Sequence, residues 1–222
     1  MGKAYGNGDS AIGDYVYQLL QPEDERLKAV CASTVEAGMP EIQVSPLDGR
    51  HLEVLTLMVG AKKAVEIGTL AGYSGVCLLK AMGAGGHLYT FESSPQHAQV
   101  AHRNFKVAGF EGQVSLYVGE ALQRLKQIEF EGPFDLVFID ADKGGYPDYL
   151  AWAEKHLRVG GVVIGDNTFA FGRITQTLTS EEAFSVKALQ DFNSSLASSK
   201  SFCTTIFPTG EGLTVGVKVK NI

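Results

Sequence analysis

The chain has 222 residues, of which 45% are hydrophobic and 20% are charged, and its formal net charge is −6. This length favours one domain over two, and the composition is typical of a folded protein rather than a disordered one. The acidic balance, without a run of Lys or Arg, argues against a protein that binds duplex nucleic acid.

Three widely separated cysteines, Cys31, Cys77 and Cys203, form no C-x-x-C pair. Their odd number and spacing predict reduced thiols rather than a zinc ribbon or a disulfide framework. The first residues lack the apolar core of a signal peptide, and no apolar segment approaches the roughly 20 residues of a membrane span. We therefore expect a cytoplasmic protein with no membrane partner.

The first sixty residues predict helices, over 10–20, 23–38 and 46–59. We expect residues 1–60 to form a helical cap rather than a separate domain, ahead of an α/β core over 61–222, so that residues 1–222 make one domain.

Strand-like and helix-like segments then alternate along the chain. Strands are expected at 64–67, 87–92, 113–118, 134–140 and 160–166, and helices at 73–82, 95–108, a short stretch ending at 125, 146–156 and 181–196. Two further strands, 202–208 and 213–219, are joined by the turn TGEG. The alternation predicts right-handed βαβ units in a Rossmann-like, doubly wound α/β fold. Its sheet would have seven strands, mostly parallel with one antiparallel, and helices on both faces.

Four acidic residues, Glu66, Glu92, Asp140 and Asp166, lie at the ends of predicted strands. In sheets of this kind ligands bind at the carboxyl ends of the strands. A single acid there often caps the next helix, but capping is a poor explanation for four acids at one edge. We therefore expect a ligand site at this edge.

The segment EIGTLAGYSG (66–75) leads from a strand through a glycine-rich turn into a helix. Gly68 and Gly72 would let the backbone approach a ligand closely, although a plain tight turn would also use them. The spacing is not G-x-G-x-x-G, and Glu66 would repel a pyrophosphate but tolerate a cationic sulfonium ligand. Glu92, about 20 residues further on, can accept hydrogen bonds from both hydroxyls of a ribose, or can simply begin the next helix.

The segments IDADKGGY (139–146) and GDNTF (165–169) end neighbouring predicted strands. Asp140, Asp166 and Asn167 together offer an oxygen donor set that suits Mg²⁺, Mn²⁺ or Ca²⁺. Asp166 and Asn167 can face one ligand only where the strand has given way to a turn. Turn chemistry alone also accounts for an Asp-Asn pair, and Lys143 by itself is typical of a solvated loop lysine.

From about Met39 to Val219 the chain resembles the metal-dependent O-methyltransferase family that includes caffeoyl-CoA and catechol O-methyltransferases. The similar segments, in order, are VSPLDG (44–49), EIGTLAGYSG, LYTFE (88–92), IDADKGGY, GGVVIGDNT (160–168) and PTGEGLTV (208–215). Their order and spacing carry the resemblance, which implies S-adenosylmethionine (SAM) as cofactor and a homodimer.

The resemblance also implies roles for individual residues. A divalent cation, most readily Mg²⁺, is assigned to Asp140, Asp166 and Asn167. Lys143 is assigned as catalytic base, with Asp140 as a second catalytic residue. The cofactor contacts that it implies are Val44, Glu66, Gly68, Thr69, Ser74, Glu92, Ala121, Asp140 and Asp142.

The expected activity is SAM-dependent and metal-dependent methylation of a hydroxyl on a small aromatic vicinal diol, whose two oxygens can chelate one cation. After GDNT the plant enzymes of the family carry Leu-Trp-Asn-Gly, whereas this chain carries Phe169-Ala170-Phe171-Gly172. We therefore expect residues 169–171 to form one wall of the acceptor pocket, with Ala170 widening it. A catechol-like acceptor is then favoured over a coenzyme A thioester.

Three alternatives remain open at this point. A nucleotide-dependent oxidoreductase is disfavoured by the glycine spacing, and a methyltransferase-like binding protein without turnover is disfavoured by the intact Asp140, Lys143, Asp166 and Asn167. A methyltransferase acting on RNA bases is disfavoured by the acidic balance.

Overall fold

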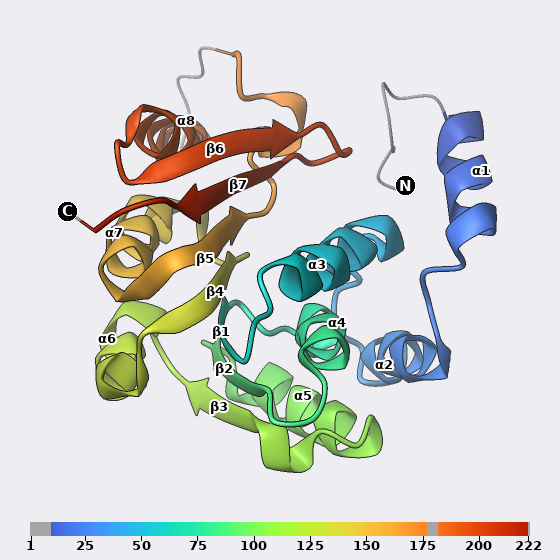
Figure 1. Cartoon of the computed structure of the whole chain (residues 1–222). Coiled ribbons are helices and arrows are strands. Elements are labelled where there is room, and N and C mark those ends of the chain that lie inside the picture. The colour runs from blue at the N-terminus through green and yellow to red at the C-terminus, as the bar shows by residue number, and fades with distance from the viewer. Residues whose placement is uncertain (1–9, 177–181, 222) are drawn as a thin grey trace.

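The structure, a computed structural model, describes residues 10–176 and 182–221. A single sheet runs through it, in the order β3-β2-β1-β4-β5-β7-β6 (Figure 1). The strands are β1 (Lys63–Ile67), β2 (His87–Glu92), β3 (Val114–Val118), β4 (Phe134–Ile139), β5 (Leu157–Gly165), β6 (Phe202–Phe207) and β7 (Leu213–Lys218). β7 runs antiparallel to β5 and β6, and the remaining neighbours pair in parallel. This confirms the expected fold class, including its one antiparallel strand.

The α-helices are α1 (Ser10–Leu20), α2 (Glu25–Glu36), α3 (Pro46–Met58), α4 (Tyr73–Met82), α5 (Pro95–Val107), α6 (Ala121–Leu125), α7 (Tyr146–His156) and α8 (Glu182–Ser198). Short 3₁₀ turns are η1 (Glu111–Gln113), η2 (Lys126–Glu131), η3 (Lys143–Gly145) and η4 (Ala170–Gly172). No helix within the described residues is long and apolar enough to cross a membrane.

Helix starts follow the local sequence. The Ser45 side chain accepts a hydrogen bond from the Asp48 amide (3.1 Å), and Pro46 occupies the first turn of α3. Ser94 and Pro95 begin α5 in the same way. Both pairs combine a hydroxyl cap with a proline whose missing N–H costs nothing in the first turn.

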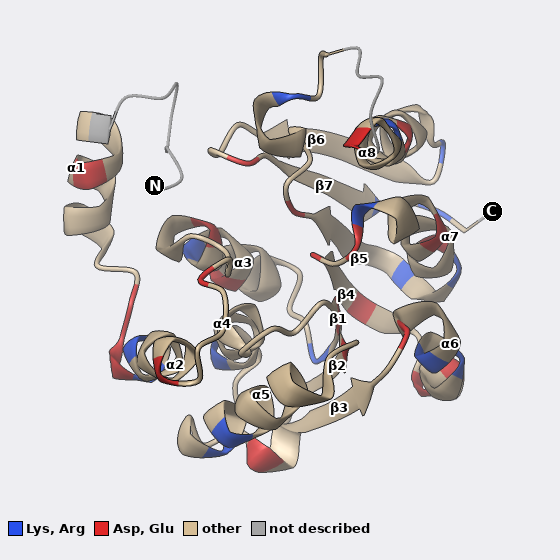
Figure 2. Cartoon of the chain, turned by 180° about the vertical axis from the view of Figure 1, so that it is seen from behind, with Lys and Arg blue, Asp and Glu red and all other residues tan. Residues whose placement is uncertain are grey.

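Two apolar layers hold the helices on the sheet. Successive strand residues point to opposite faces, so Ala64 of β1 packs with the core under α2 to α5. Val65 and Ile67 of the same strand pack with the core under α6 to α8. Because both faces of the central strands are covered, these strands are apolar almost throughout. Lys and Arg are interspersed with Asp and Glu on the outer helices (Figure 2).

One strand boundary differs from the prediction by more than one residue. β5 begins at Leu157 instead of residue 160, and its pairing with β4 shifts register between Phe134 and Leu136. Gly160 has a φ of +79° within this irregular stretch. Glycine adopts that left-handed conformation readily, so the Gly-Gly pair forms a bulge within the strand instead of marking its start.

Backbone hydrogen bonds continue one residue past the strand ends. The Gly68 amide donates to the Phe91 carbonyl (3.0 Å), and the Asp140 amide donates to the Ile67 carbonyl (2.8 Å). The Asp166 amide donates to the Ile139 carbonyl (3.0 Å). The residues that follow β1, β4 and β5 are therefore held side by side at one edge of the sheet.

Candidate functional site

A cavity of about 860 Å³ opens at the carboxyl ends of β1 to β4, where the sequence predicted a ligand site. Its lining includes all but two of the predicted site residues: Val44, Gly68, Thr69, Ser74, Glu92, Ala121, Asp140, Asp142, Lys143 and Asn167. The two that do not line it, Glu66 and Asp166, are wholly buried.

The glycine-rich turn after β1 packs tightly against the turn after β4. Gly68 has a φ of +99°, and a Cβ built on it would lie 1.9 Å from the carbonyl oxygen of Asp140. A residue with a side chain would therefore clash with backbone and also suffer an unfavourable φ. Gly68 thus allows the two turns that line the cavity to approach each other.

Glu92 links two segments of the cavity wall. Its Oε2 accepts a hydrogen bond from the Leu70 amide (2.8 Å), and its Oε1 accepts one from the Ser94 amide (2.9 Å). The carboxylate therefore ties the glycine-rich turn to the end of β2. Each carboxylate oxygen can accept more than one hydrogen bond, so Glu92 can still accept from a ligand in the cavity.

Glu66 lies behind the cavity wall. The Ser74 hydroxyl donates to its Oε1 (2.6 Å), and the Thr90 hydroxyl donates to its Oε2 (2.5 Å). Burial raises the pKa of Glu66 to about 7, and the negative charges of Asp140 and Glu92 act in the same direction. Glu66 is linked to the cavity through Ser74, and through Thr90 to Thr69, but does not line it, so its predicted role as a direct cofactor contact stays a prediction.

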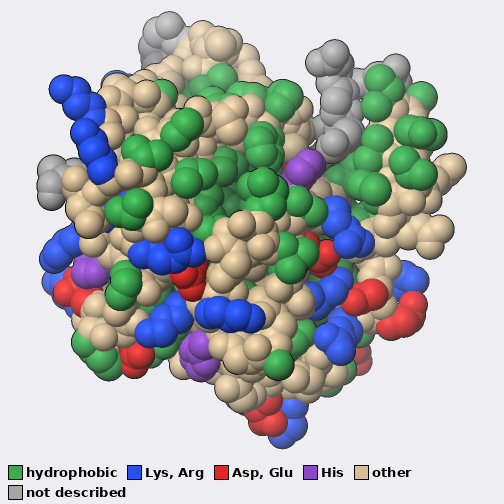
Figure 3. Space-filling model, in the orientation of Figure 1, with side chains coloured by type: hydrophobic (Ala, Val, Ile, Leu, Met, Phe, Trp, Pro, Cys, Tyr) green, Lys and Arg blue, Asp and Glu red, His purple; other side chains and the backbone are tan. Residues whose placement is uncertain are grey.

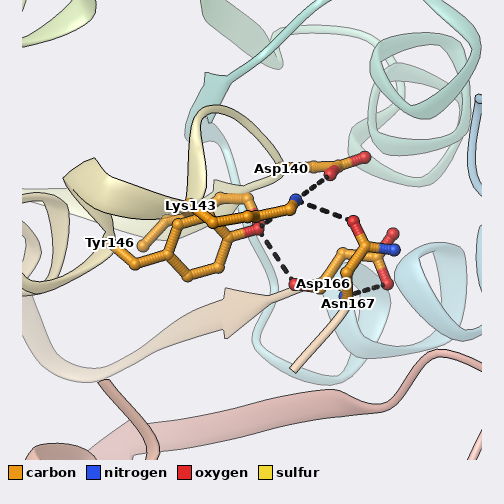
Figure 4. A network of polar contacts seen from close by, with 6 residues as sticks. Asp140, Lys143, Tyr146, Asp166 and Asn167 are labelled. Atoms are coloured by element: carbon orange, nitrogen blue, oxygen red, sulfur yellow. Dashed lines mark hydrogen bonds and ion pairs between the residues drawn. The ribbon is translucent and has the colours of Figure 1, made fainter. Parts of the chain in front are cut away.

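Lys143 is the centre of the polar network at one end of the cavity (Figure 4). Its Nζ donates to Asp140 Oδ1 (3.0 Å), Asn167 Oδ1 (2.7 Å) and the Tyr146 hydroxyl (2.9 Å). An ammonium group has three N–H bonds, so these three acceptors use all of them. The structure thus brings together Asp140, Lys143 and Asn167, which the sequence placed in separate segments.

Asp166 and Asn167 follow β5 in a turn. The sequence requires such a turn if both side chains are to face one ligand. β5 ends at Gly165, and Asn167 has a φ of +55°. Asp166 Oδ1 accepts a hydrogen bond from the Asn167 amide (2.7 Å), while the Asn167 side chain faces Lys143. Within residues 10–176 and 182–221, no group of three or more His, Cys, Asp and Glu side chains is arranged to hold a metal ion. The predicted set contains two such residues and an asparagine, and it stays a prediction.

Asp142 lies in the cavity wall beside Tyr149. Its Oδ1 accepts a hydrogen bond from the Tyr149 hydroxyl (2.6 Å), and its Oδ2 accepts one from the Gly145 amide (3.0 Å). These contacts fix the carboxylate at the start of α7. Val44 and Ala121 line the same cavity from the segment before α3 and from the start of α6.

The expectation that residues 169–171 form one wall of the pocket is wrong at Phe169 and Ala170, which do not line the cavity. Only Phe171 of residues 169–171 lines the cavity, with 55% of its surface exposed. Ala170 is 2% exposed and packs in the core under α6 to α8. Ala170 and Phe171 both have a positive φ (52° and 55°), which redirects their side chains relative to an extended chain. Ala170 therefore does not widen the pocket.

Two tyrosines of the site were missed from the sequence. Tyr146 contacts Lys143, and Tyr149 contacts Asp142 and lines the cavity. Tyr146 follows Lys143 by three residues at the start of a helix, a spacing that brings side chains onto one side. That spacing was the available signal.

The sequence of this chain is similar to those of known O-methyltransferases. Residues 18–219 match the family described as O-methyltransferase. The chain belongs to this O-methyltransferase family. A catechol O-methyltransferase from Niastella koreensis is 39% identical over 210 residues, which cover 94% of this chain and 92% of the relative. Another from Mycobacterium tuberculosis is 39% identical over 163 residues, which cover 73% of this chain and 74% of the relative.

Solved structures of this family have the same fold. An O-methyltransferase from Bacillus cereus, in complex with SAH, superimposes with a TM-score of 0.85 at 35% identity and covers 94% of this chain and 97% of that one. One from Streptomyces achromogenes, involved in tomaymycin synthesis and in complex with SAM, has a TM-score of 0.86 at 30% identity, covering 95% and 96%. The comparisons confirm both the family resemblance and an O-methyltransferase activity.

Proposed function

We propose that this O-methyltransferase uses SAM and a divalent cation to methylate a hydroxyl of a small aromatic vicinal diol. The observation that carries the proposal is the convergence of Asp140, Lys143 and Asn167 at one end of the cavity. Similar structures in complex with SAM or SAH, and relatives named catechol O-methyltransferase, support it.

The cavity fits SAM in size and in chemistry. Its volume of about 860 Å³ falls in the range of about 300–1,000 Å³ that small-molecule sites occupy. Gly68 lets the two turns that form its wall pack together, and Glu92 offers oxygens to ribose hydroxyls. Thr69, Ser74, Ala121 and Asp142 supply further contacts from the surrounding wall. When bound, SAM supplies the methyl group from a positively charged sulfonium.

The donor set beside Lys143 also fits a cation. Asp140 Oδ1 and Asn167 Oδ1 approach the same positively charged nitrogen at 3.0 and 2.7 Å, so both oxygens already face one positive charge. Asp166, next in the chain to Asn167, supplies a third oxygen ligand in the proposal. Such hard oxygen donors suit Mg²⁺ first, with Mn²⁺ and Ca²⁺ as alternatives. When bound, the cation supplies Lewis-acid activation and a template for the two diol oxygens.

In this proposal the amine of Lys143 is the proton acceptor. A phenol has a pKa near 10, so it must lose its proton to become a good nucleophile. In its neutral form the Lys143 amine takes that proton from the acceptor hydroxyl, while Asp140 and Asn167 orient it. The deprotonated acceptor is an anion and the sulfonium is a cation, so the two charges neutralise each other as the methyl group is transferred. Water stabilises the separate charges more than the transition state, so exclusion of water from the cavity favours the reaction. The chain thus binds, orients and deprotonates the acceptor.

The acceptor side of the cavity carries an aromatic side chain beside Lys143. Phe171 lines it, and an aromatic face stacks on a planar ring. The cavity lining within the described residues contains one lysine, Lys143, and no arginine. Phosphate groups are bound best by several Lys or Arg side chains, so this lining is poorly suited to bind the phosphates of coenzyme A. These features favour a catechol or a catechol-bearing flavonoid over caffeoyl-CoA.

We also propose a homodimer, which the family resemblance implies. α1 lies apart from the sheet and carries exposed apolar side chains, among them Tyr15 (65% exposed) and Leu19 (64% exposed) (Figures 1 and 3). A helix that exposes such side chains gains from burial against a partner. Light scattering on the purified chain tests this, with a dimer mass expected and a monomer mass contradicting it.

An acceptor comparison tests the activity. The purified protein, supplied with SAM and Mg²⁺, is assayed with catechol, a catechol-bearing flavonoid, caffeoyl-CoA and phenol, which lacks the second hydroxyl. We expect catechols to be methylated with a kcat/KM at least tenfold above that of phenol, because only a vicinal diol presents two oxygens. A preference for caffeoyl-CoA of about tenfold or more, or equal turnover of phenol, would overturn the assigned acceptor.

A further inference from the structure

Tyr146 is a wholly buried residue of the network around Lys143 that the proposed mechanism does not use. It begins α7, three residues after Lys143, and its ring packs edge-on against Phe192, with centroids 5.3 Å apart. Figure 4 shows its hydroxyl between the Lys143 amine and the turn that holds Asp166.

The hydroxyl of Tyr146 has a fixed pattern of donation and acceptance. It lies 2.9 Å from the Asp166 carbonyl oxygen and 3.1 Å from the Ile139 carbonyl oxygen, and neither carbonyl can donate. Its single hydrogen therefore points to a carbonyl, and a lone pair is left for the Lys143 N–H at 2.9 Å.

These contacts join the lysine to the strands that carry the other site residues. Ile139 ends β4, and Asp166 follows β5. Lysine has a flexible four-carbon stem, so its amine needs neighbours to hold it in one place. A neutral amine keeps two N–H bonds and one lone pair. With one N–H on Tyr146 and the other on Asp140 or Asn167, the lone pair takes the third direction, on the side of Asp140 and Asn167 where the cation and the acceptor are proposed to bind.

The geometry points to Tyr146 as a positioning residue that fixes the Lys143 amine through a one-way hydrogen bond and so aims its lone pair at the acceptor hydroxyl. The inference rests on the proposed role of Lys143 as base. Tyr146 itself exchanges no proton with the acceptor.

A double-mutant cycle tests the inference, with Tyr146→Phe, Lys143→Ala and the double variant. The phenylalanine keeps the packing on Phe192 and removes only the hydroxyl. We expect Tyr146→Phe to lower kcat for catechol by roughly 10- to 100-fold, because the catalytic amine is displaced. KM should change little. The loss should shrink for nitrocatechol, which is already acidic. In the Lys143→Ala background, Tyr146→Phe should change kcat by less than about twofold.

Tyr89→Phe is the matched control, because it removes the hydroxyl of a buried tyrosine that contacts Glu131 outside the cavity lining. Its kcat should stay unchanged. If Tyr146→Phe fails to fold, 3-fluorotyrosine at position 146 keeps every contact and weakens the oxygen as an acceptor, and a smaller loss in the same direction is expected.

The outcomes separate the two proposals. A Tyr146→Phe loss that is equal for all acceptors, that persists in the Lys143→Ala background, or that is absent would overturn the positioning role of Tyr146. Unchanged kcat in Lys143→Ala alone would overturn the assignment of Lys143 as base, and the positioning role with it.

Discussion

Gly68 and the backbone carbonyl of Asp140 are in direct contact, so that a Cβ on Gly68 would lie 1.9 Å from that oxygen. This contact joins the turn that would hold the cofactor to the turn that carries Asp140 and Lys143. It explains how two segments more than seventy residues apart in the chain form one cavity wall.

Gly68→Ala should therefore destabilise the fold and disrupt the site together. We expect a loss of at least about 2 kcal/mol in the free energy of unfolding, from the clash and the positive φ combined. Urea denaturation measures it. Gly85→Ala is the control, since Gly85 also has a positive φ (+83°) but has no atom within 4 Å of a built Cβ. Equal losses in both variants would show that the contact with Asp140 is unimportant.

Glu92→Ala should weaken the binding of SAH. The variant loses the proposed ribose contacts and also the hydrogen bonds from the Leu70 and Ser94 amides. The expected cost is about 1.5–3 kcal/mol, the scale of hydrogen bonds to a charged group. Calorimetry measures the affinity, and Glu111→Ala, which removes only an exposed ion pair with Lys106, is the control. An affinity equal to that of the native chain would refute the assignment.

The stability of the cofactor-free protein should depend on pH through Glu66. Its pKa rises to about 7 on folding, from a usual 4.5, so the folded state binds more protons between those values. The stability that Glu66 contributes is therefore fully present below pH 4.5 and is lost as the pH rises through 7. At about 1.4 kcal/mol per pH unit, this amounts to at most about 3 kcal/mol.

Urea denaturation at pH 5 and pH 8, for the native chain and Glu66→Gln, isolates this effect. The glutamine cannot ionise, so the variant should gain stability relative to the native chain at pH 8. The same difference between the two proteins at both pH values would contradict the raised pKa.

Phe171→Ala and Ala170→Trp should have opposite kinds of effect. Phe171 is half exposed in the cavity wall, so its removal should raise KM for catechol with little change in stability.

Ala170 is buried in the core, so a tryptophan there should lower the free energy of unfolding by about 1–3 kcal/mol or more through overpacking. Phe130→Ala, at an exposed site away from the cavity, is the control for both measurements. A stable Ala170→Trp that merely rejects large acceptors would support a pocket position instead.

Much of the fold could be predicted because its physical signals are local. Strands such as 134–139 are apolar apart from Asp135, since helices cover both faces, and Ser-Pro pairs begin α3 and α5. Parallel strands bring their carboxyl ends to one edge, so Asp140 and Asn167 could be placed together from sequence alone.

The parts that could not be predicted depend on backbone conformations that the residue types do not announce. Ala170 and Phe171 adopt positive φ values that few such residues adopt, and this turns Ala170 into the core. Gly160 gives a bulge where the sequence suggested a strand start. The contacts of the Tyr146 hydroxyl with two strand ends and Lys143 depend on the tertiary fold and have no signal in the strand pattern.

The most direct test of the proposed chemistry is the rate of methyl transfer from SAM to catechol after metal removal. The protein is treated with EDTA, checked by elemental analysis and assayed before and after Mg²⁺ is added, with Mn²⁺ in parallel. If Asp140, Asp166 and Asn167 hold a required cation, activity should fall to background in chelator and return with either metal. Full activity in excess EDTA, on protein that contains no metal, would contradict the proposal.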